Sequence, residues 1–310
     1  MTRFLLTILL VVAPFTILNA APRVAVSIAP VHSLVQGVMH GVASAELLLK
    51  SNRSPHSGSL PPSTVRSLLS ADLVVWVGPP LEGSLVKALD GLEPDRKISL
   101  LAAEGMRLRQ IRPASAMHEH GDQDQKDDDG VQPGSQTTVD PHIWLSSINA
   151  SIIVNTVAQW LIEHDRSNAP HYHRNAQALN AEIAGWRAKA EAELAPIRDL
   201  KFMVFHDAYQ YFEHDFGLTA SASVTIDPER PPGAKHLREL RHRLQADDVN
   251  CIFTEPQFSS DAVNILVEDT DVRIGMLDPL GVEIKPGREM WFRLMQGLVS
   301  GMTGCLATAS

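Results

Sequence analysis

Short apolar runs that alternate with helix-patterned segments, twice along the chain, constrain the fold more than any other feature of this sequence. In the first half, four runs rich in Val, Ile and Leu are predicted to be strands: residues 23–29, 46–51, 72–78 and 97–102. The segments between them have apolar residues at helical spacing: residues 31–42, 63–71 and 81–89. Because strands joined through helices run parallel, this half is predicted to be an α/β lobe.

The same alternation resumes in the second half of the chain. Its predicted strands are residues 201–206, 221–226, 250–256 and 272–277. Its predicted helices are residues 207–217, 234–245, 259–269 and about 288–301. This half is therefore predicted to form a second α/β lobe.

A long helical region separates the two halves. Residues 147–164 are amphipathic, and residues 174–197 are rich in the strong helix formers Ala, Glu, Leu and Arg. We interpret the second segment as a rigid helix between the lobes. The predicted fold is thus α/β, with two lobes that each have a mostly parallel sheet and flanking helices. The predicted parts are an N-terminal lobe at 21–167, a connecting helix at 168–197 and a C-terminal lobe at 198–310.

The first residues are typical of a secretory signal peptide. Arg3 provides the basic start, residues 4–18 are an apolar run, and Ala20 is the small residue near which cleavage is expected. The run is too short and too interrupted for a comfortable membrane span. We expect residues 1–20 to be removed on export; an N-terminal anchor that stays attached is the alternative.

Two cysteines remain in the mature chain, Cys251 and Cys305. In an exported protein an even pair suggests a disulfide. Two buried free thiols are the alternative. A metal site built on both is less favoured, because no CxxC spacing accompanies them.

Three of the 13 histidines occupy places where parallel sheets bind ligands. His56 lies in the turn after the second predicted strand, His142 in the turn VDPHIWL, and His206 ends the strand KFMVFH; Asp278 also directly follows a strand. In open α/β sheets, ligands bind at the carboxyl ends of strands. Imidazole and carboxylate together suit tetrahedral zinc, or manganese and iron if more oxygen is present. His32, in a βα turn, is the next candidate to line a cleft.

Five motifs, in order, resemble the metal-binding periplasmic proteins of ABC importers, and among them the zinc-uptake (ZnuA) group. They are SPHSGSLPPSTVRSLLSADLVVWVGPPLE, DPHIWLS, FMVFHDAYQYFEHDFGL, CIFTEPQF and GMLDPLG. The resemblance runs from about residue 23 to Cys305. It implies two lobes joined by one long helix, with zinc held in the cleft between them. It also implies a periplasmic monomer that delivers the ion to a membrane permease driven by an ATPase. Since a long helix limits lobe motion, closure is expected to be small.

The resemblance also assigns ligands. Carried over by motif, His56, His142 and His206 become three imidazole ligands, and Asp278 falls where several relatives place a carboxylate ligand. Manganese-type members usually have a carboxylate in place of the third imidazole, so this set favours zinc, and manganese or iron is the alternative cargo. Some zinc-type members have an acid directly before the first histidine. Pro55 stands there in this chain, so a water molecule is the alternative to Asp278 as fourth ligand.

Several neighbouring residues receive secondary expectations. Cys251 and Cys305 fall where the zinc-type members have a disulfide. Glu255 is a candidate to support the ligands from behind, and Trp144 is expected to be buried beside His142. Asp207 is expected either to cap the helix that begins there or to hydrogen-bond a ligating imidazole.

Residues 112–139 have almost no hydrophobic side chains and are acidic. Zinc-type members often have a loop rich in histidine and acids at this point. Here His118, Glu119 and His120 offer two imidazoles and a carboxylate, and one hypothesis is a weak secondary zinc site that collects the ion. A solvated, disordered insertion without a binding role is the alternative.

Other functional classes are disfavoured. The formal net charge of -9 argues against a nucleic-acid partner, which would need a basic surface. A zinc hydrolase would need an open coordination position and a general base. Glu255 and Asp278 are the candidates for that base. The chain has no HExxH and no GxSxG motif, so we expect a binding protein without enzymatic activity.

Overall fold

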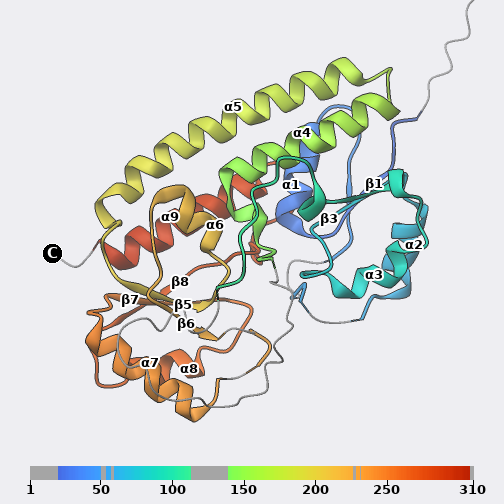
Figure 1. Ribbon diagram of the computed structural model, residues 1–310. Coiled ribbons are helices and arrows are strands. Elements are labelled where there is room, and N and C mark those ends of the chain that lie inside the picture. The colour runs from blue at the N-terminus through green and yellow to red at the C-terminus, as the bar shows by residue number, and fades with distance from the viewer. Residues whose placement is uncertain are drawn as a thin grey trace, which may run out of the picture.

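The computed structural model describes residues 20–49, 54–56, 59–112, 139–225, 228–230 and 232–307. The predicted signal peptide, apart from Ala20, lies outside the described residues, and so does the predicted weak zinc site at His118, Glu119 and His120. Two sheets, each flanked by helices, lie below a pair of long helices, α4 and α5 (Figure 1). This arrangement confirms the predicted α/β fold class.

The N-terminal sheet has the strand order β2-β1-β3-β4, and every pair is parallel. Its strands are β1 (Val24–Val26), β2 (Glu46–Leu47), β3 (Leu73–Trp76) and β4 (Lys97–Ser99). Its helices are α1 (Ala29–Val38), α2 (Pro62–Ser70) and α3 (Gly83–Leu89), with the short 3-10 turns η1 (Pro94–Arg96) and η2 (Leu100–Ala102). Both faces of β3 are covered, because Leu73 and Val75 pack toward α1 while Val74 and Trp76 pack toward α2 and α3.

The C-terminal sheet has the order β6-β5-β7-β8, again with parallel pairs. Its strands are β5 (Phe202–His206), β6 (Ala222–Thr225), β7 (Cys251–Thr254) and β8 (Arg273–Met276). Its helices are α6 (Gln210–Phe216), α7 (Ala234–Ala246), α8 (Asp261–Val267) and α9 (Met290–Leu306). The last helix continues to 306 rather than ending near 301, because its apolar stripe extends through Met302 and Leu306.

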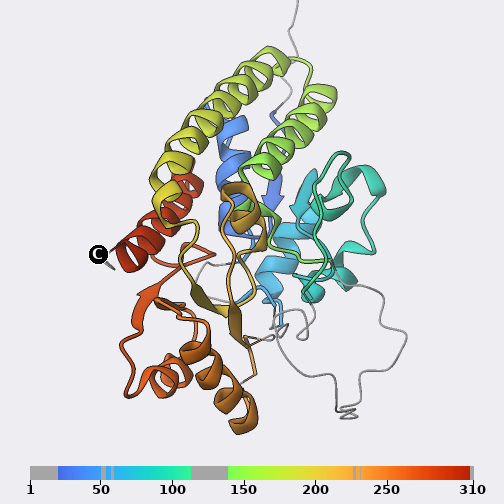
Figure 2. The same ribbon diagram turned by 60° about the vertical axis from the view of Figure 1, so that its left-hand side comes forward.

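Two long helices connect the sheets. Helix α4 (Ser147–His164) begins where Ser146 accepts the backbone N–H groups of Ile148 and Asn149, and it matches the predicted range. Helix α5 (Ala169–Leu194) follows and ends in the turn η5 (Ala195–Ile197). It begins five residues before the predicted 174, with a proline in its first turn, where proline is well tolerated. It contacts α1, α4 and α9, which all lie on its inner side in Figures 1 and 2.

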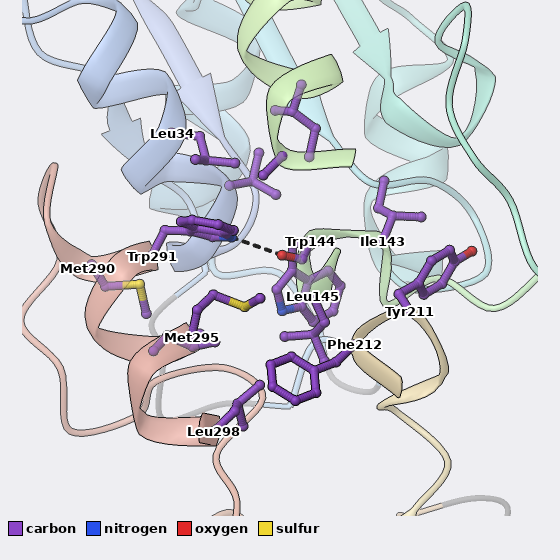
Figure 3. Packing of buried hydrophobic residues seen from close by; sticks show 14 of the residues in the cluster. Leu34, Ile143, Trp144, Leu145, Tyr211, Phe212, Met290, Trp291, Met295 and Leu298 are labelled. Carbon is purple, nitrogen blue, oxygen red and sulfur yellow. Dashed lines mark hydrogen bonds between the residues drawn. The ribbon is translucent and has the colours of Figure 1, made fainter. Parts of the chain in front are cut away.

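One hydrophobic core runs through both halves of the molecule. It joins Leu34 of α1 and Trp144 to Phe212 of α6 and Trp291 of α9. Figure 3 shows these side chains packed together, with the indole N–H of Trp291 donating to the backbone oxygen of Trp144 at 2.9 Å. The halves are therefore joined by a continuous apolar interior as well as by α5. The lobe boundaries near 168 and 197 stay a prediction.

A disulfide links Cys251 in β7 to Cys305 near the end of α9, with the two Cα atoms 6.2 Å apart. It fastens the second sheet to its covering helix. The predicted pairing is confirmed, and the free-thiol alternative is wrong. Among the helices of the described ranges, none has the length and apolar character that crossing a membrane requires.

Candidate metal site

Three imidazoles from distant parts of the chain meet between the two sheets. His56 lies in a turn after β2, His142 immediately precedes the 3-10 turn η4 (Ile143–Leu145), and His206 is the last residue of β5. Each offers one ring nitrogen, and these nitrogens lie within 4.8 Å of one another. The sequence-predicted histidines are therefore brought together at the carboxyl ends of the strands.

The spacing of two ring nitrogens fits a tetrahedral ion. Nε2 of His142 and Nε2 of His206 are 3.3 Å apart. Zinc binds imidazole nitrogen at about 2.0–2.1 Å, and tetrahedral angles then place two such nitrogens about 3.3–3.4 Å apart. The pair therefore has the separation that a shared tetrahedral ion requires.

In both His142 and His206, the second ring nitrogen is hydrogen-bonded to a carboxylate. Nδ1 of His142 donates to Asp140 Oδ1 at 2.7 Å, and Nδ1 of His206 donates to Glu255 Oε1 at 2.6 Å. Each bond fixes the ring orientation and leaves Nε2 directed at the site. Glu255 was expected in this supporting role; Asp140 was not recognised in the sequence, although it stands two residues before His142 in the same DPH motif.

Burial sets the protonation of the site. It lowers the pKa of His142 well below its usual value, so this ring is neutral and has a free lone pair. Burial also lowers the pKa of His206, but the charge and hydrogen bond of Glu255 outweigh that effect and leave the pKa raised. Burial raises the pKa of Asp140 to about 7. When the His206 ring is protonated, its Nε2–H can donate to Nε2 of His142 at 3.3 Å.

A small cavity adjoins the three rings. Its volume is about 10 Å³. This is roughly the room that one water molecule needs. Its other lining residues are Ser54, Pro55, Trp144, Glu255, Gln257, Phe258, Pro279 and Leu280. The mostly apolar wall keeps bulk water away from the buried rings of His142 and His206 and strengthens electrostatic interactions inside, whereas His56 is partly exposed.

Asp278 is not part of the histidine cluster. Its Oδ1 accepts the N–H groups of Leu280 and Gly281 at 3.1 and 2.8 Å and the amide N–H of Gln257 at 2.8 Å. Its Oδ2 accepts the N–H of Val282 at 2.6 Å. Asp278 therefore closes the turn after β8, and its role as a fourth ligand stays a prediction.

Asp207 has neither of the two roles expected from the sequence. Helix α6 begins at Gln210 without a side-chain cap, and the partner of the His206 ring is Glu255. Asp207 instead pairs with Arg112, a residue that the sequence did not single out. The two segments are 95 residues apart, and no local signal indicates the contact.

Trp144 and His32 are both buried. The indole of Trp144 packs beside His142, with ring centroids 5.3 Å apart, and donates to the backbone oxygen of Pro279 at 2.7 Å. This matches its expected place. His32 lies inside α1, where Nε2 contacts the backbone oxygen of Ala45 at 3.1 Å. It is not among the residues that line the cavity.

Comparison with known proteins gives consistent matches. The family model described as "ZnuA: Zinc-uptake complex component A periplasmic" matches residues 24–305. A relative from Brucella suis biovar 1 (strain 1330), named high-affinity zinc uptake system protein ZnuA, is 34% identical over 306 residues, covering 92% of this chain and 91% of the relative. A solved structure titled "Crystal structure of ZnuA" aligns with a TM-score of 0.76 at 22% identity, covering 92% of this chain and 99% of that chain. The Pseudomonas aeruginosa protein FpvC, solved in complex with Mn²⁺, aligns with a TM-score of 0.78 at 22% identity, covering 94% and 100%. At this identity, the two solved structures bear on the fold alone.

Proposed function

The chain belongs to the ZnuA family of periplasmic zinc-uptake components, and we propose that it captures Zn²⁺ at His56, His142 and His206 and delivers the ion to the permease of an ABC importer. The observation that carries this proposal is the pair of Nε2 atoms 3.3 Å apart, each backed by a carboxylate on Nδ1. The resemblance found in the motifs is confirmed by the family match.

The charge balance of the site supports a divalent ion. As zinc ligands the three imidazoles would be neutral, while the carboxylates of Asp140 and Glu255 would supply two negative charges directly behind His142 and His206. Bound zinc would keep Nδ1 of both rings protonated and both carboxylates ionised. The four hydrogen bonds of Asp278 favour a water molecule in the fourth position, because Asp278 could bind the ion only by releasing some of them.

Ligand type favours zinc over manganese. Three imidazoles suit a borderline ion, whereas manganese prefers more oxygen ligands. Import of manganese or iron is the alternative within the same type of protein. A hydrolase is disfavoured because the chain has no HExxH or GxSxG motif, and Oε1 of Glu255 is committed to the Nδ1–H of His206 and the hydroxyl of Tyr209. We therefore expect no catalytic turnover.

The family also suggests the surroundings in which the chain works. We propose export with cleavage near Ala20, action in the periplasm as a monomer, and partners consisting of a membrane permease and its ATPase. The lobes proposed for capture are 21–167 and 198–310, joined by 168–197. His118, Glu119 and His120 are proposed as a weak secondary zinc site.

The test is the metal content of the mature protein after dialysis against buffered zinc and manganese together. Wild type should retain about one tight zinc, and His56→Ala should lose it. His171→Ala, which removes an exposed imidazole of α5, is the matched control and should retain the ion. Retention of manganese by wild type, or of zinc by His56→Ala, would refute the proposed cargo or the proposed ligands.

A further inference from the structure

We propose that Arg112 is a positioning residue for zinc capture: it fixes the segment that carries His206 against the segment that carries His142 before the ion arrives. The two imidazoles are 64 residues apart in the chain: His206 ends β5, whereas His142 precedes η4 and lies outside both sheets. Their 3.3 Å spacing therefore needs contacts between the two segments. This inference rests on the proposed function, since it concerns the same zinc site.

The guanidinium of Arg112 forms hydrogen-bonded ion pairs with two carboxylates from the second half of the chain. Nε donates to Asp207 Oδ2 at 2.8 Å, and Nη2 donates to Asp207 Oδ1. Nη1 donates to Glu213 Oε2 at 2.8 Å, and Nη2 donates to Glu213 Oε1 at 3.1 Å. Because Asp207 directly follows His206 in the chain, its ion pair with Arg112 fixes the position of the backbone at the end of β5.

Uncharged contacts join the same two segments. The side-chain N–H of Gln210 donates to Asp140 Oδ2 at 3.0 Å, and the other oxygen of Asp140 holds the ring of His142. The hydroxyl of Tyr211 donates to the backbone oxygen of Asp140 at 2.7 Å and accepts the N–H of Arg109 at 3.0 Å. The residues that follow His206 are thus bonded to the residues that precede His142. The segment of Arg112 is itself paired with those residues, because the N–H of Asp140 donates to the backbone oxygen of Arg109 at 2.8 Å and Gln110 forms a β-bridge with Val139. Arg112 therefore adds the charged part of this connection.

Burial makes the Arg112 contacts costly to lose. The side chains of Asp207 and Glu213 are only 12% and 5% exposed. Removing one partner of a buried ion pair leaves an uncompensated charge, which displaces the segment or draws in water. The expected result is a shift of the end of β5, and with it of His206, relative to His142.

The planar shape of the Arg112 guanidinium allows its positioning effect to be tested separately from the effect of its charge. It is a planar fork that binds carboxylates through paired N–H groups, whereas lysine offers a single flexible point charge. Arg112→Lys keeps the positive charge but cannot donate paired hydrogen bonds to both Asp207 and Glu213. Arg112→Gln loses both the paired hydrogen bonds and the charge. If charge alone mattered, lysine would restore zinc binding.

The experiment measures zinc affinity, by competition with a chelator, and the zinc-induced rise in Tm of the mature full chain. Arg112→Lys and Arg112→Gln should both lose zinc affinity by about tenfold, the lower end of the effect of losing a group bonded directly to a metal ligand, because Arg112 holds the residue next to His206 and not His206 itself. The zinc-induced rise in Tm should shrink accordingly, since stabilisation by a ligand follows its affinity. The control is Arg288→Gln, which breaks a partly exposed ion pair with Glu182 and should keep wild-type affinity.

Several outcomes would overturn the inference. A purely structural role would lower the Tm of the zinc-free and zinc-bound forms equally and leave affinity unchanged. Full affinity in Arg112→Lys would show that charge, not position, matters. If the Arg112 variants do not fold, Glu213→Gln, which keeps the pairing with Asp207, should still weaken zinc binding, and unchanged affinity there would refute the inference. Failure of wild type to bind zinc would instead refute the proposed function itself.

Discussion

Removing the charge of Glu255 is the sharpest test of how the site presents its imidazoles. Glu255 is 3% exposed, and its Oε1 accepts Nδ1–H of His206 at 2.6 Å and the hydroxyl of Tyr209 at 3.1 Å. Glu255→Gln keeps the shape and one acceptor oxygen but removes the charge. Loss of such a carboxylate lowers metal affinity by roughly 10–100-fold, which is about 1.4–2.7 kcal/mol. We expect a loss of this size above the pKa of His206.

The same variant should change the pH dependence of zinc binding. Burial lowers the pKa of His206, and the Glu255 charge more than reverses that effect, so the pKa is raised in wild type. Because zinc must replace the proton on this ring, wild-type affinity falls as the pH falls through the raised pKa. In Glu255→Gln burial acts without the opposing charge, so the pKa is lower and the decline begins at lower pH. The affinity ratio of wild type to variant should therefore be largest at high pH and shrink in acid.

Chelator competition from about pH 5 to pH 8 covers the range in which histidines titrate. Glu104→Gln, which alters an exposed glutamate outside the cavity, is the matched control and should follow the wild-type curve. Equal affinity of wild type and Glu255→Gln at high pH, or identical pH profiles, would refute the assigned role of Glu255.

Four further predictions concern the rest of the molecule. Asp278→Asn should keep zinc affinity within about tenfold of wild type, the smallest loss usual for a group that supports metal ligands without binding the ion. A loss as large as that of His56→Ala would instead show that Asp278 is a ligand. Replacing both Cys251 and Cys305 by serine should lower the free energy of unfolding in urea by roughly 4 kcal/mol, because the disulfide closes a loop with a sequence separation of 54. Zinc should leave the radius of gyration in small-angle scattering unchanged within error, and a clear compaction would contradict the continuous core. Deleting residues 114–136 should remove any weakly held zinc and leave the tight ion, whereas unchanged weak binding would exclude the loop as a collector.

Much of the fold could be predicted because its signals are local. Buried parallel strands such as β3 and β5 appear as continuous apolar runs bounded by polar residues, and α4 begins at a serine cap. The observed strands are shorter than the apolar runs. Residues 100–102, for example, are apolar but form the turn η2 after β4, since apolar side chains can be buried in a turn as well as in a strand.

Convergence of the three histidines could also be predicted: His56 and His206 follow strands, whose carboxyl ends are where parallel sheets bind ligands, and His142, which follows no strand, is assigned to the same site by its DPH motif. Their supporting contacts could not. Arg112 reaches Asp207 across 95 residues, and nothing in the spacing of either residue indicates that pairing. The hydrogen bonds of Asp278 could not be predicted either, because an aspartate that follows a strand is equally suited to binding a metal ion and to closing a turn. Sequence patterns thus locate candidate ligands, and the tertiary structure decides which of them are free to bind.

The continuous core also limits how the ion can leave. Trp144 donates to the backbone oxygen of Pro279, and Trp291 donates to the backbone oxygen of Trp144, so the two halves are bonded directly behind the cavity. A wide swing of the lobes would expose this apolar interior and break both bonds at once. The polar contacts that join Arg112 and Asp140 to the segment after His206 are separate from this core, so they can loosen without such a swing. A permease that disturbs these contacts would separate His142 from His206 and lower zinc affinity while the core stays intact.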